Sequence, residues 1–558
     1  MDLHGRTTSS AASAEAIDGR LSVNNTEHRI HLNAADRTLA TQFGYKPVFQ
    51  RQFGFLSTFS FAVSISGLFS TVTTTFVYPL YAGGSASAVW CWLISGAGCM
   101  CIAASVAEIV SAYPTCGGLY YSVSRLAPQR WVPSISWLVG WTNLLGQLTG
   151  LASSEYGAAQ ILLAAVSMGR DFDWYPTTGT TVGVMAALTV LSGIVNSLPT
   201  SWIERLTSTY VIAHFSLLLA CAIALLVKTE HKHNASYVFT NVDAESGWTP
   251  GFSFLLGFLS VSWTMTGYDS TAHISEEIKD PAILAPRAIF LAMSCTYILG
   301  WLFTIVLCLC MGDIDSILAS PIEQPVAQIY YNSLGKGGGI FFTIAAFLVL
   351  QFVCFTATQA LGRSVFAFSR DRLLPFSTTW IQINKRTNTP LYAVWICIFW
   401  IIAINLIALG SYTAISGVFN VCAIAFDWSY CIPIACKLIF GKFEPGPWSM
   451  GQPMVSKLVN AWACLWTLFV SIIFIFPDYR PDTSANMNYA IAYVALIAVA
   501  STSLWYAGGR KYYTGPLVEV DAQEVVDVGG GEFQLTQGCE EQVGQGDKHS
   551  VRQSVEIS

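Results

Sequence analysis

Two ionisable side chains lie four residues apart within an apolar stretch of this 558-residue sequence. Asp269 and His273 share one helical face, because residues at i and i+4 are separated by about one turn. A carboxylate inside the membrane is costly and usually has a function. It can act as the counter-ion of an amine or as a proton carrier. An unperturbed histidine titrates near neutral pH, so His273 is a candidate proton carrier. A structural role, as a hydrogen-bonded histidine of the core, explains its presence equally well.

Two further carboxylates follow about one turn later. Glu276 and Glu277 stand just before Lys279-Asp280-Pro281, where the apolar stretch ends. Because charged residues and proline mark the end of a membrane helix, we expect both glutamates at the cytosolic surface. There they hold a gate or pair with Lys279 or Arg287. A role in proton coupling is the alternative.

Two more ionisable groups lie within apolar stretches. Glu155, in LASSEYGAAQ, needs a partner or a proton at that depth, and Tyr156 beside it is a candidate for the wall of a pocket. His214 is a second candidate proton carrier. The sequence thus offers Glu155, His214 and His273 for proton coupling and does not choose among them.

The stretch SISGLFSTVTTTF, residues 64–76, weakens a helix where water cannot satisfy its backbone. Freed N–H and C=O groups cost several kcal/mol each in lipid, so an unwound turn survives only where protein, ion or substrate satisfies them. A second weak turn, Thr266-Gly267-Tyr268-Asp269, follows five helices later. Interruptions at matching places in two successive five-helix units indicate an inverted-repeat transporter with a site at the membrane midplane.

The two interruptions offer complementary backbone groups. Amides around Ser66, Gly67 and Leu68 favour a carboxylate, whereas carbonyls from about Thr264 to Gly267 suit an ammonium group. Gly, Ser and Thr also occur in membrane helices simply because they allow close packing, but the matched pair favours the functional interpretation. The residues expected to bind substrate are Ser64, Ser66, Gly67, Leu68, Trp263, Gly267, Tyr268 and Asp269.

Composition indicates the elements that hold these residues. The chain is 53% hydrophobic and only 11% charged, with a mean hydropathy of +0.50, whereas a soluble domain has about 25% charged residues. It is therefore expected to be an all-α polytopic membrane protein. Windows of about 20 apolar residues predict twelve spanning helices. They cover roughly 54–78, 86–112, 132–165, 181–199, 203–228, 252–275, 287–311, 338–368, 391–410, 412–439, 458–477 and 488–507.

The charges near the ends of these spans predict their orientation. With a cytosolic amino terminus, fifteen Lys and Arg residues fall in inside loops and five in outside loops, which follows the positive-inside rule. Both termini are then cytosolic. Asn234-Ala235-Ser236 is a glycosylation sequon in a loop assigned to the outside, which agrees. The five outside residues are Arg170, Lys228, Lys232, Lys336 and Arg480.

Two polar loops on the cytosolic side have expected roles. Glu108 ends the second span before SAYPTCGGLYY, where Pro114 and Gly117-Gly118 stop the helix, and we interpret this region as a gate hinge. Residues 370–372, Arg-Asp-Arg, are expected in a solvated loop that helps to fix the orientation.

The ends of the chain and its cysteines suggest no further chemistry. Residues 1–50 are expected to be a cytosolic tail, residues 51–510 the transporter and residues 511–558 an acidic cytosolic tail. Of fifteen cysteines, all but Cys539 lie in or beside apolar segments and are expected to be small buried residues. Their spacing predicts no metal site, and we expect no cofactor and no nucleic-acid partner.

Several motifs together resemble one transporter family. The chain resembles the fungal amino acid/choline branch of the amino acid–polyamine–organocation permeases, which includes GABA and choline permeases, over about residues 45–510. The motifs are SISGLFST at 64–71, AEIVSAYPTCGGLYYSVSRLAP at 107–128, GYDSTAHISEEIKDP at 267–281, FAFSRDRLLPFS at 366–377 and SYCIPI at 429–434. The resemblance implies a five-plus-five inverted repeat with two extra helices and secondary active uptake of small amino compounds, usually with protons. Asp427, beside SYCIPI, departs from the uncharged residue often found in relatives and leaves the chemistry of the tenth span open.

Three classes of function follow. The first is a proton-coupled permease for an amino acid or GABA in the plasma membrane, with a vacuolar or other internal membrane as the alternative. A choline or polyamine transporter of the same fold is the nearest alternative, since Trp263, Tyr268 and Tyr156 would suit an aromatic cage. The second class is a nutrient receptor that has lost transport. The third, a membrane enzyme, is disfavoured because no HExxH, GxSxG or Walker loop stands in a suitable context.

Overall fold

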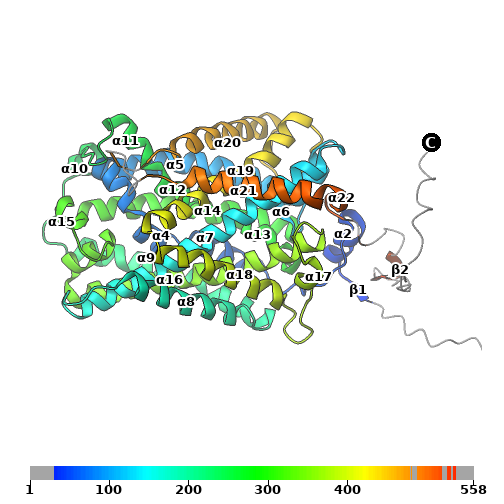
Figure 1. Ribbon diagram of the computed structural model, residues 1–558, viewed down its shortest axis with the longest axis horizontal. Helices are drawn as coiled ribbons and strands as arrows, with labels where there is room; N and C mark the ends of the chain where they lie inside the picture. The colour runs from blue at the N-terminus through cyan, green and yellow to red at the C-terminus, as the bar shows by residue number, and fades with distance from the viewer. Residues whose placement is uncertain are drawn as a thin grey trace, which may run out of the picture. The chain divides into compact units, whose positions relative to one another are not determined.

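The membrane-embedded part of the chain is built from helices. The computed structural model describes residues 30–477, 479–480, 487–517, 519, 525–529 and 532–535. Two compact units are present, Pro47–Leu517 and the two end segments Met1–Lys46 with Val518–Ser558. Within the described part of Pro47–Leu517 every regular element is a helix, which confirms the all-α prediction (Figure 1).

Twelve segments cross the bilayer. Among the described residues, ten helical segments are long and apolar enough to do so, and α7 and the interrupted α11–α13 complete the set. In chain order the segments are α3 (Phe55–Ser66) with α4 (Leu68–Thr75), α5 (Val77–Ala112), α7 (Val132–Gly169), α8 (Thr178–Val195), α9 (Thr200–Lys228), α11 (Pro250–Leu256) with α12 (Phe258–Thr264) and α13 (Ser270–His273), α14 (Pro281–Cys310), α16 (Pro325–Arg370), α18 (Leu391–Asn405) with η2 (Leu406–Leu409), α19 (Tyr412–Phe440), α20 (Pro453–Ile473) and α21 (Ala490–Leu504).

Short helices connect the spans. The sequence did not predict them, because few of them have an apolar window of their own. They are α6 (Gly118–Leu126), α10 (Ala235–Thr240), η1 (Ser275–Glu277), α15 (Ile314–Leu318), α17 (Ser377–Trp380), η3 (Trp505–Gly509) and α22 (Arg510–Tyr512).

Two spans are longer than their apolar windows. Helix α5 begins at Val77 and bends at Gly84, whose φ is 66°, and α16 begins at Pro325 and bends at Gly335, whose φ is 72°. Both bends stand where the chain leaves the apolar window. Glycine permits the left-handed backbone without strain, so these helices continue beyond the bilayer without remaining straight.

The packing follows the expected inverted repeat. The second and seventh spans, α5 and α14, form one extensive contact, and the third and eighth spans, α7 and α16, form another. These are corresponding members of the two five-helix units. In the apolar stretch of the first span 78% of the residues are buried, against 11% in the last span. The first span therefore lies inside the bundle, while α21 lies at its margin.

The end segments form a separate unit. Asn33 caps α2 (Ala34–Phe43) by accepting a hydrogen bond from the Asp36 amide, and Gly44 ends the helix. Three short strands form an antiparallel sheet in the order β1-β3-β2. They are β1 (Ile30–Leu32), β2 (Val525–Gly529) and β3 (Glu532–Leu535). Cys539 and much of the predicted acidic tail lie outside the described residues.

Candidate functional site

The first span is interrupted at one glycine. Gly67 adopts the left-handed conformation, with φ 49° and ψ 37°, and separates α3 from α4. A Cβ at this position would lie 2.2 Å from Val353 Cγ2 of α16, so the site requires glycine for its backbone and for close packing. The first amides of α4, at Leu68 and Phe69, have no partner within their own helix. The sequence predicted free amides around Ser66, Gly67 and Leu68. Of these, Leu68 is at the start of α4, whereas the Gly67 amide donates to the Val63 carbonyl of α3 at 3.1 Å.

The sixth span is interrupted over a longer segment. Helix α12 ends at Thr264 and α13 begins at Ser270, and between them Gly267 has φ 76°. A Cβ on Gly267 would lie 2.8 Å from Ile65 Cγ2, so the two interruptions are in contact with one another. The predicted discontinuity of both spans is therefore confirmed.

A small cavity lies between the interruptions. Its volume is about 60 Å³, and Ile65 and Thr71 line it from the first span. Trp263, Thr266 and Gly267 line it from the sixth span. The Thr266 hydroxyl is buried and has no hydrogen-bond partner among the described residues, so it is available to a ligand. The remaining lining residues are Gln147, Gly150, Leu151, Ser154, Ser270, Val353, Ala357, Ala360, Cys422 and Phe426.

The predicted binding residues divide into two groups around this cavity. Trp263 and Gly267 line it directly. The others form the wall behind: the Ser66 hydroxyl lies 2.9 Å from Thr296 Oγ1, and the Ser64 hydroxyl accepts a hydrogen bond from Thr356 at 3.2 Å. The residues that are not part of the lining are Ser64, Ser66, Gly67, Leu68, Tyr268 and Asp269.

Asp269 is the centre of a buried hydrogen-bond network. Its Oδ1 accepts a hydrogen bond from the Tyr430 hydroxyl at 2.7 Å, and its Oδ2 accepts one from the Asn143 amide. His273 Nε2 lies 3.1 Å from the same Oδ2. Asn143 in turn accepts from Gln147, which lines the cavity. Asp269 therefore reaches the cavity through two polar side chains of α7.

The geometry determines how many protons the Asp269 and His273 side chains share. His273 Nδ1 lies 2.8 Å from the carbonyl oxygen of Cys116, so Nδ1 carries a hydrogen and donates it. The contact between Nε2 and Asp269 Oδ2 then requires one further proton between the two atoms. The proton resides on the carboxyl, giving two neutral groups, or on the imidazole, giving an ion pair.

Glu276 and Glu277 do not lie at the surface, contrary to the prediction. Both side chains are buried, and their partners are arginines of α16 instead of Lys279 or Arg287. Arg370 donates to both carboxylate oxygens of Glu276, at 2.9 and 3.2 Å. Arg363 Nε donates to Glu277 at 2.7 Å, with both side chains fully buried.

The prediction of a solvated loop at residues 370–372 is also wrong for two of the three residues. Arg370 and Asp371 are buried, and Asp371 accepts a hydrogen bond from the Leu517 amide at 3.0 Å. Arg372 is exposed as expected. The error has a simple cause, since α16 extends to Arg370 and carries these charges into the packed inner end of the bundle.

The chain before the first span is bound to the segment after the sixth. The Phe53 amide donates to the Glu277 carbonyl and the Lys279 amide donates to the Phe53 carbonyl, both at 3.0 Å. Arg51 Nη1 donates to the carbonyls of Ser275 and Ile278. Together with the two buried ion pairs, these bonds close the end of the bundle that carries residues 51–53 and 275–279.

Glu108 holds a third buried ion pair near that end. The Glu108 carboxylate accepts from Lys437 of α19 and from the Ser456 hydroxyl of α20. Helix α5 ends at Ala112, and the chain turns through Gly118, whose φ is 55°, into α6. The predicted break at Pro114 and Gly117-Gly118 is confirmed, and Glu108 ties α5 to α19 and α20.

Glu155 and His214 lie away from the central cavity. Glu155 Oε1 accepts a hydrogen bond from Ser192 of α8 at 2.6 Å, and no Lys, Arg or His of the described residues pairs with this carboxyl. The neutral acid is the form that such surroundings accommodate. His214 is buried, and neither ring nitrogen has a partner within the described chain.

Sequence inspection missed several polar residues of the network. Asn143 and Gln147 stand four apart on α7, a polar pair within a spanning helix, and this spacing was the signal available. Ser364 of α16 exchanges hydrogen bonds with Gln147 at 2.9 and 3.0 Å. Tyr430 lies in the SYCIPI motif, whereas Asp427 one turn before it is buried in the same helix.

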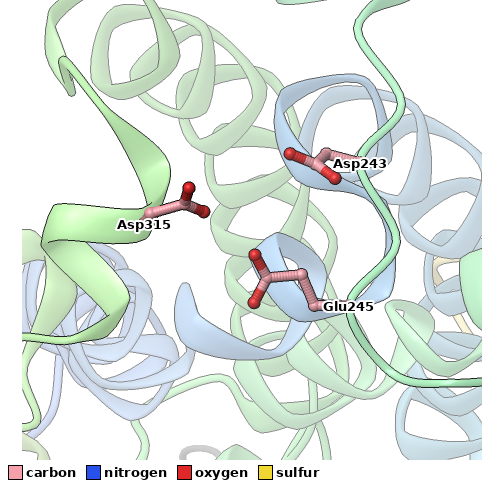
Figure 2. Close-up of side chains that lie close together, drawn as sticks. All are labelled: Asp243, Glu245 and Asp315. Carbon is pink, nitrogen blue, oxygen red and sulfur yellow. The ribbon is translucent and has the colours of Figure 1, made fainter.

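Three exposed carboxylates lie close together (Figure 2), one of them on α15, which lies at the opposite end of the bundle from α6 and α17 (Figure 1). Asp243, Glu245 and Asp315 present oxygens within 4.8 Å of one another. Partial burial raises the pKa of Glu245, and the hydrogen bond to Asp315 and the charges of Asp315 and Asp243 raise it further. Exposed acidic groups of this kind are common without an ion, so we assign no metal to them.

Asn234, the predicted glycosylation site, is exposed at the start of α10. Its side-chain oxygen accepts a hydrogen bond from the Tyr237 amide at 2.8 Å, which is an ordinary helix cap.

Comparison with known proteins gives a consistent result. The family described as amino acid permease matches residues 53–497. An uncharacterized amino-acid permease of Schizosaccharomyces pombe is 56% identical over 487 residues, which cover 86% of this chain and 90% of the relative. Amino-acid permease 2 of Neurospora crassa is 47% identical over 91% of this chain and 92% of its own length. The GABA-specific permease of Saccharomyces cerevisiae is 30% identical over 94% and 91%, respectively.

Proposed function

The chain belongs to the amino acid permease family, and we propose that it carries a small zwitterionic amino acid, GABA or an α-amino acid, together with a proton. As a member of that family it is an integral membrane protein that transports amino acids and is not an enzyme. The choice of amino acid, the coupled proton and the binding residues are the content of the proposal.

One observation carries the proposal: residues that flank the first interruption, Ile65 and Thr71, line the same cavity as Thr266 and Gly267 of the second. The amides at the start of α4 suit the carboxylate of the substrate. Carbonyls at the end of α12, near Thr264 and Met265, suit its ammonium group, since the last carbonyls of a helix lack partners within it. A ligand with both charges satisfies both interruptions, whereas choline, which has no carboxylate, satisfies one.

The central cavity is smaller than a substrate site in this conformation. A volume of about 60 Å³ is well below the roughly 300 Å³ of the smallest common ligand pockets. The site is therefore contracted in this conformation and has to widen when a substrate enters. Thr266, Ser154 and Gln147 provide polar groups on its wall for that substrate.

The Asp269–His273 pair is our candidate for the proton carrier. It shares one proton in the present geometry, and Gln147 connects it to the cavity by a contact of 3.2 Å with His273 Nε2. Loss of that proton leaves a net negative charge without a counter-ion in a buried site, which is unfavourable. Binding of an ammonium group nearby would offset this charge, so substrate and proton occupancy would be linked.

We further propose that both termini are cytosolic and that the protein resides in the plasma membrane. The distribution of Lys and Arg among the loops supports this orientation. The end with the buried ion pairs is then the inner end, and the end with Asp243, Glu245 and Asp315 is the outer end. Antibody labelling of terminal epitope tags in intact and permeabilised cells tests the orientation.

Uptake in permease-deficient yeast tests the function. Cells expressing the chain receive labelled GABA, a mixture of α-amino acids, choline and putrescine, with and without a protonophore. The proposal predicts saturable uptake of GABA or an α-amino acid that is lost with the proton gradient. Uptake of choline alone would refute the zwitterion site, and uptake that persists with the protonophore would refute proton coupling.

A further inference from the structure

Two more cavities continue from the central one toward the outer end of the bundle. The first, of about 120 Å³, shares Ser154 and Trp263 with the central cavity. The second, of about 320 Å³, shares Gln160 and Glu323 with the first. Shared lining residues mean that the cavities are adjacent, so they form one series between the central site and the loops at 175–178 and 321–324. We call the two outer cavities the vestibule.

The vestibule has one charged residue in its wall. Serine, threonine, tyrosine, asparagine and glutamine side chains dominate its polar lining, and Glu323 is the only charged group among the lining residues. No Lys, Arg or His of the described residues forms an ion pair with Glu323. A carboxylate without a partner in a cleft attracts cations, because the surrounding protein focuses its field into the cleft.

The backbone at Glu323 is unusual for a glutamate. Its φ is 53°, a left-handed conformation that a non-glycine residue adopts at an energetic cost. The Glu323 amide donates to the Ser320 carbonyl at 3.1 Å, and Gln324 and Pro325 follow at the start of α16. The turn before α16 therefore places Glu323, an exposed residue, in the lining of both cavities of the vestibule.

Aromatic rings accompany this carboxylate. Tyr156 lines the larger cavity, and its ring lies 5.6 Å from that of Phe419, which lines the smaller one. Trp263 stands at the boundary with the central cavity. Ring faces attract ammonium groups, so they suit the same ligand as Glu323 does.

We propose that the vestibule is a second substrate site, which binds the ammonium group of an amine substrate at Glu323 before the substrate passes Ser154 and Trp263. This inference rests on the proposed function, since it assumes that an amino compound enters from the end that we assign to the outside. The site selects for a positive charge and has no counterpart for the carboxylate. It therefore accounts for recognition of the amine, while the central cavity recognises the complete zwitterion.

The backbone at Glu323 provides a matched pair of variants. Asn and Asp are the non-glycine residues best tolerated in the left-handed region, and they differ from one another in charge. Glu323→Asn removes the charge and Glu323→Asp keeps it, while both preserve the turn. The surface level of each variant is measured first, so that only delivered protein is compared.

The first experiment measures the charge preference of the vestibule without transport. A cysteine is introduced by Gln160→Cys, because Gln160 lines both cavities. Its reaction rates with a cationic and an anionic methanethiosulfonate are compared, and the parent chain corrects for native cysteines. We expect the ratio of cationic to anionic rates to fall about tenfold in Glu323→Asn and to persist in Glu323→Asp. An unchanged ratio in Glu323→Asn would overturn the proposal.

The second experiment measures uptake of labelled GABA and labelled alanine. We expect Glu323→Asn to raise KM several-fold with Vmax unchanged, and Glu323→Asp to resemble the parent chain. Equal KM values in the parent and Glu323→Asn would overturn the proposal, as would an equal loss in both variants. If the parent chain takes up neither probe, the proposed function has failed for these probes, and the reagent ratio still decides whether the vestibule selects cations.

Discussion

At the scale of single residues, the orientation of the His273 ring toward Asp269 follows from one hydrogen bond, from His273 Nδ1 to the Cys116 carbonyl. That bond fixes the tautomer and leaves Nε2 to face Asp269. Glu155, the other buried carboxyl considered for proton coupling, has no such basic neighbour among the described residues and does not reach the cavity. This difference is why we propose the pair, and not Glu155, as the proton carrier.

Replacing Asp269 tests this assignment. In Asp269→Asn the side chain cannot ionise, so His273 stays neutral and the pair no longer exchanges a proton. We expect accumulation driven by a proton gradient to fall at least about tenfold, the equivalent of about 1.4 kcal/mol of coupling, while substrate exchange in proteoliposomes continues. Gradient uptake and counterflow are measured on the same preparation.

Glu155→Gln is the matched control, since it replaces a buried carboxyl outside the network with an amide of similar size. It should leave gradient uptake close to that of the parent chain. If Glu155→Gln abolishes accumulation and Asp269→Asn does not, the proton carrier is Glu155 and our assignment is wrong.

The buried pair of Glu277 and Arg363 predicts a large effect on stability. Glu277→Gln leaves the fully buried guanidinium without a counter-charge, so we expect the free energy of unfolding to fall by about 3–5 kcal/mol. Thermal unfolding of the protein in detergent measures the loss. The exposed pair of Lys336 and Asp171 is the control, and Lys336→Met should cost no more than about 1 kcal/mol. Equal shifts in the two variants would contradict the argument.

The raised pKa of Glu245 predicts a pH dependence in the loop at residues 241–247. Its carboxyl pKa is raised in the folded protein, so the folded loop is favoured at acidic pH and loses this contribution as pH rises through the folded pKa. Hydrogen exchange of residues 241–247, corrected for intrinsic rates, should show more protection near pH 5 than near pH 7. Glu245→Gln should remove the difference. Asp173→Asn, an exposed change elsewhere, should not alter it.

At the scale of elements, the two interruptions are held open by glycine. Gly67→Ala and Gly267→Ala place a methyl group 2.2 Å from Val353 and 2.8 Å from Ile65, at backbone conformations that cost alanine about 1–2 kcal/mol. We expect uptake to fall more than about tenfold with the protein still delivered to the membrane, because the helix ends that form the site are displaced.

Gly183→Ala in α8 is the control for these two variants. No atom lies within 4 Å of the added methyl group there, and uptake should be unchanged. Normal saturable uptake in both Gly67→Ala and Gly267→Ala would refute the assignment of the site to the interruptions.

The sequence predicted these elements well because their signals are local. Runs of apolar residues located the spans, and Gly67 and Gly267 located the interruptions. The partners of Glu276 and Glu277 were not predictable, since Arg370 and Arg363 lie 94 and 86 residues away along the chain. Asn143 and Tyr430 were missed for the same reason, as polar residues of separate helices meet at Asp269 only in the folded bundle.

At the scale of the whole molecule, the proposed proton carrier and the buried ion pair of Glu276 and Arg370 share one neighbour, Cys116. The Cys116 carbonyl accepts from His273, and the Cys116 amide donates to Glu276, the partner of Arg370. Under the proposed function, a change in the protonation of the Asp269–His273 pair would act on the same peptide segment that contacts the buried ion pairs. The vestibule adjoins the central cavity, and the buried ion pairs lie at the end that we propose to be cytosolic.

This arrangement predicts that the inner end opens when substrate and proton are bound. Cys116 is fully buried here, and opening would expose its thiol to the cytosolic side. We expect maleimide labelling of Cys116 in inside-out vesicles to rise about tenfold with GABA at acidic pH, a coupling of ordinary size for a two-state transporter. Cys116→Ser defines the background from the other cysteines. Asp269→Asn should abolish the effect of pH, because it removes a titrating group. Glu277→Gln should raise labelling without substrate, because it weakens the buried ion pair that holds this end closed. Labelling that is insensitive to substrate, pH and both variants would show that the two ends of the molecule are not coupled through this segment.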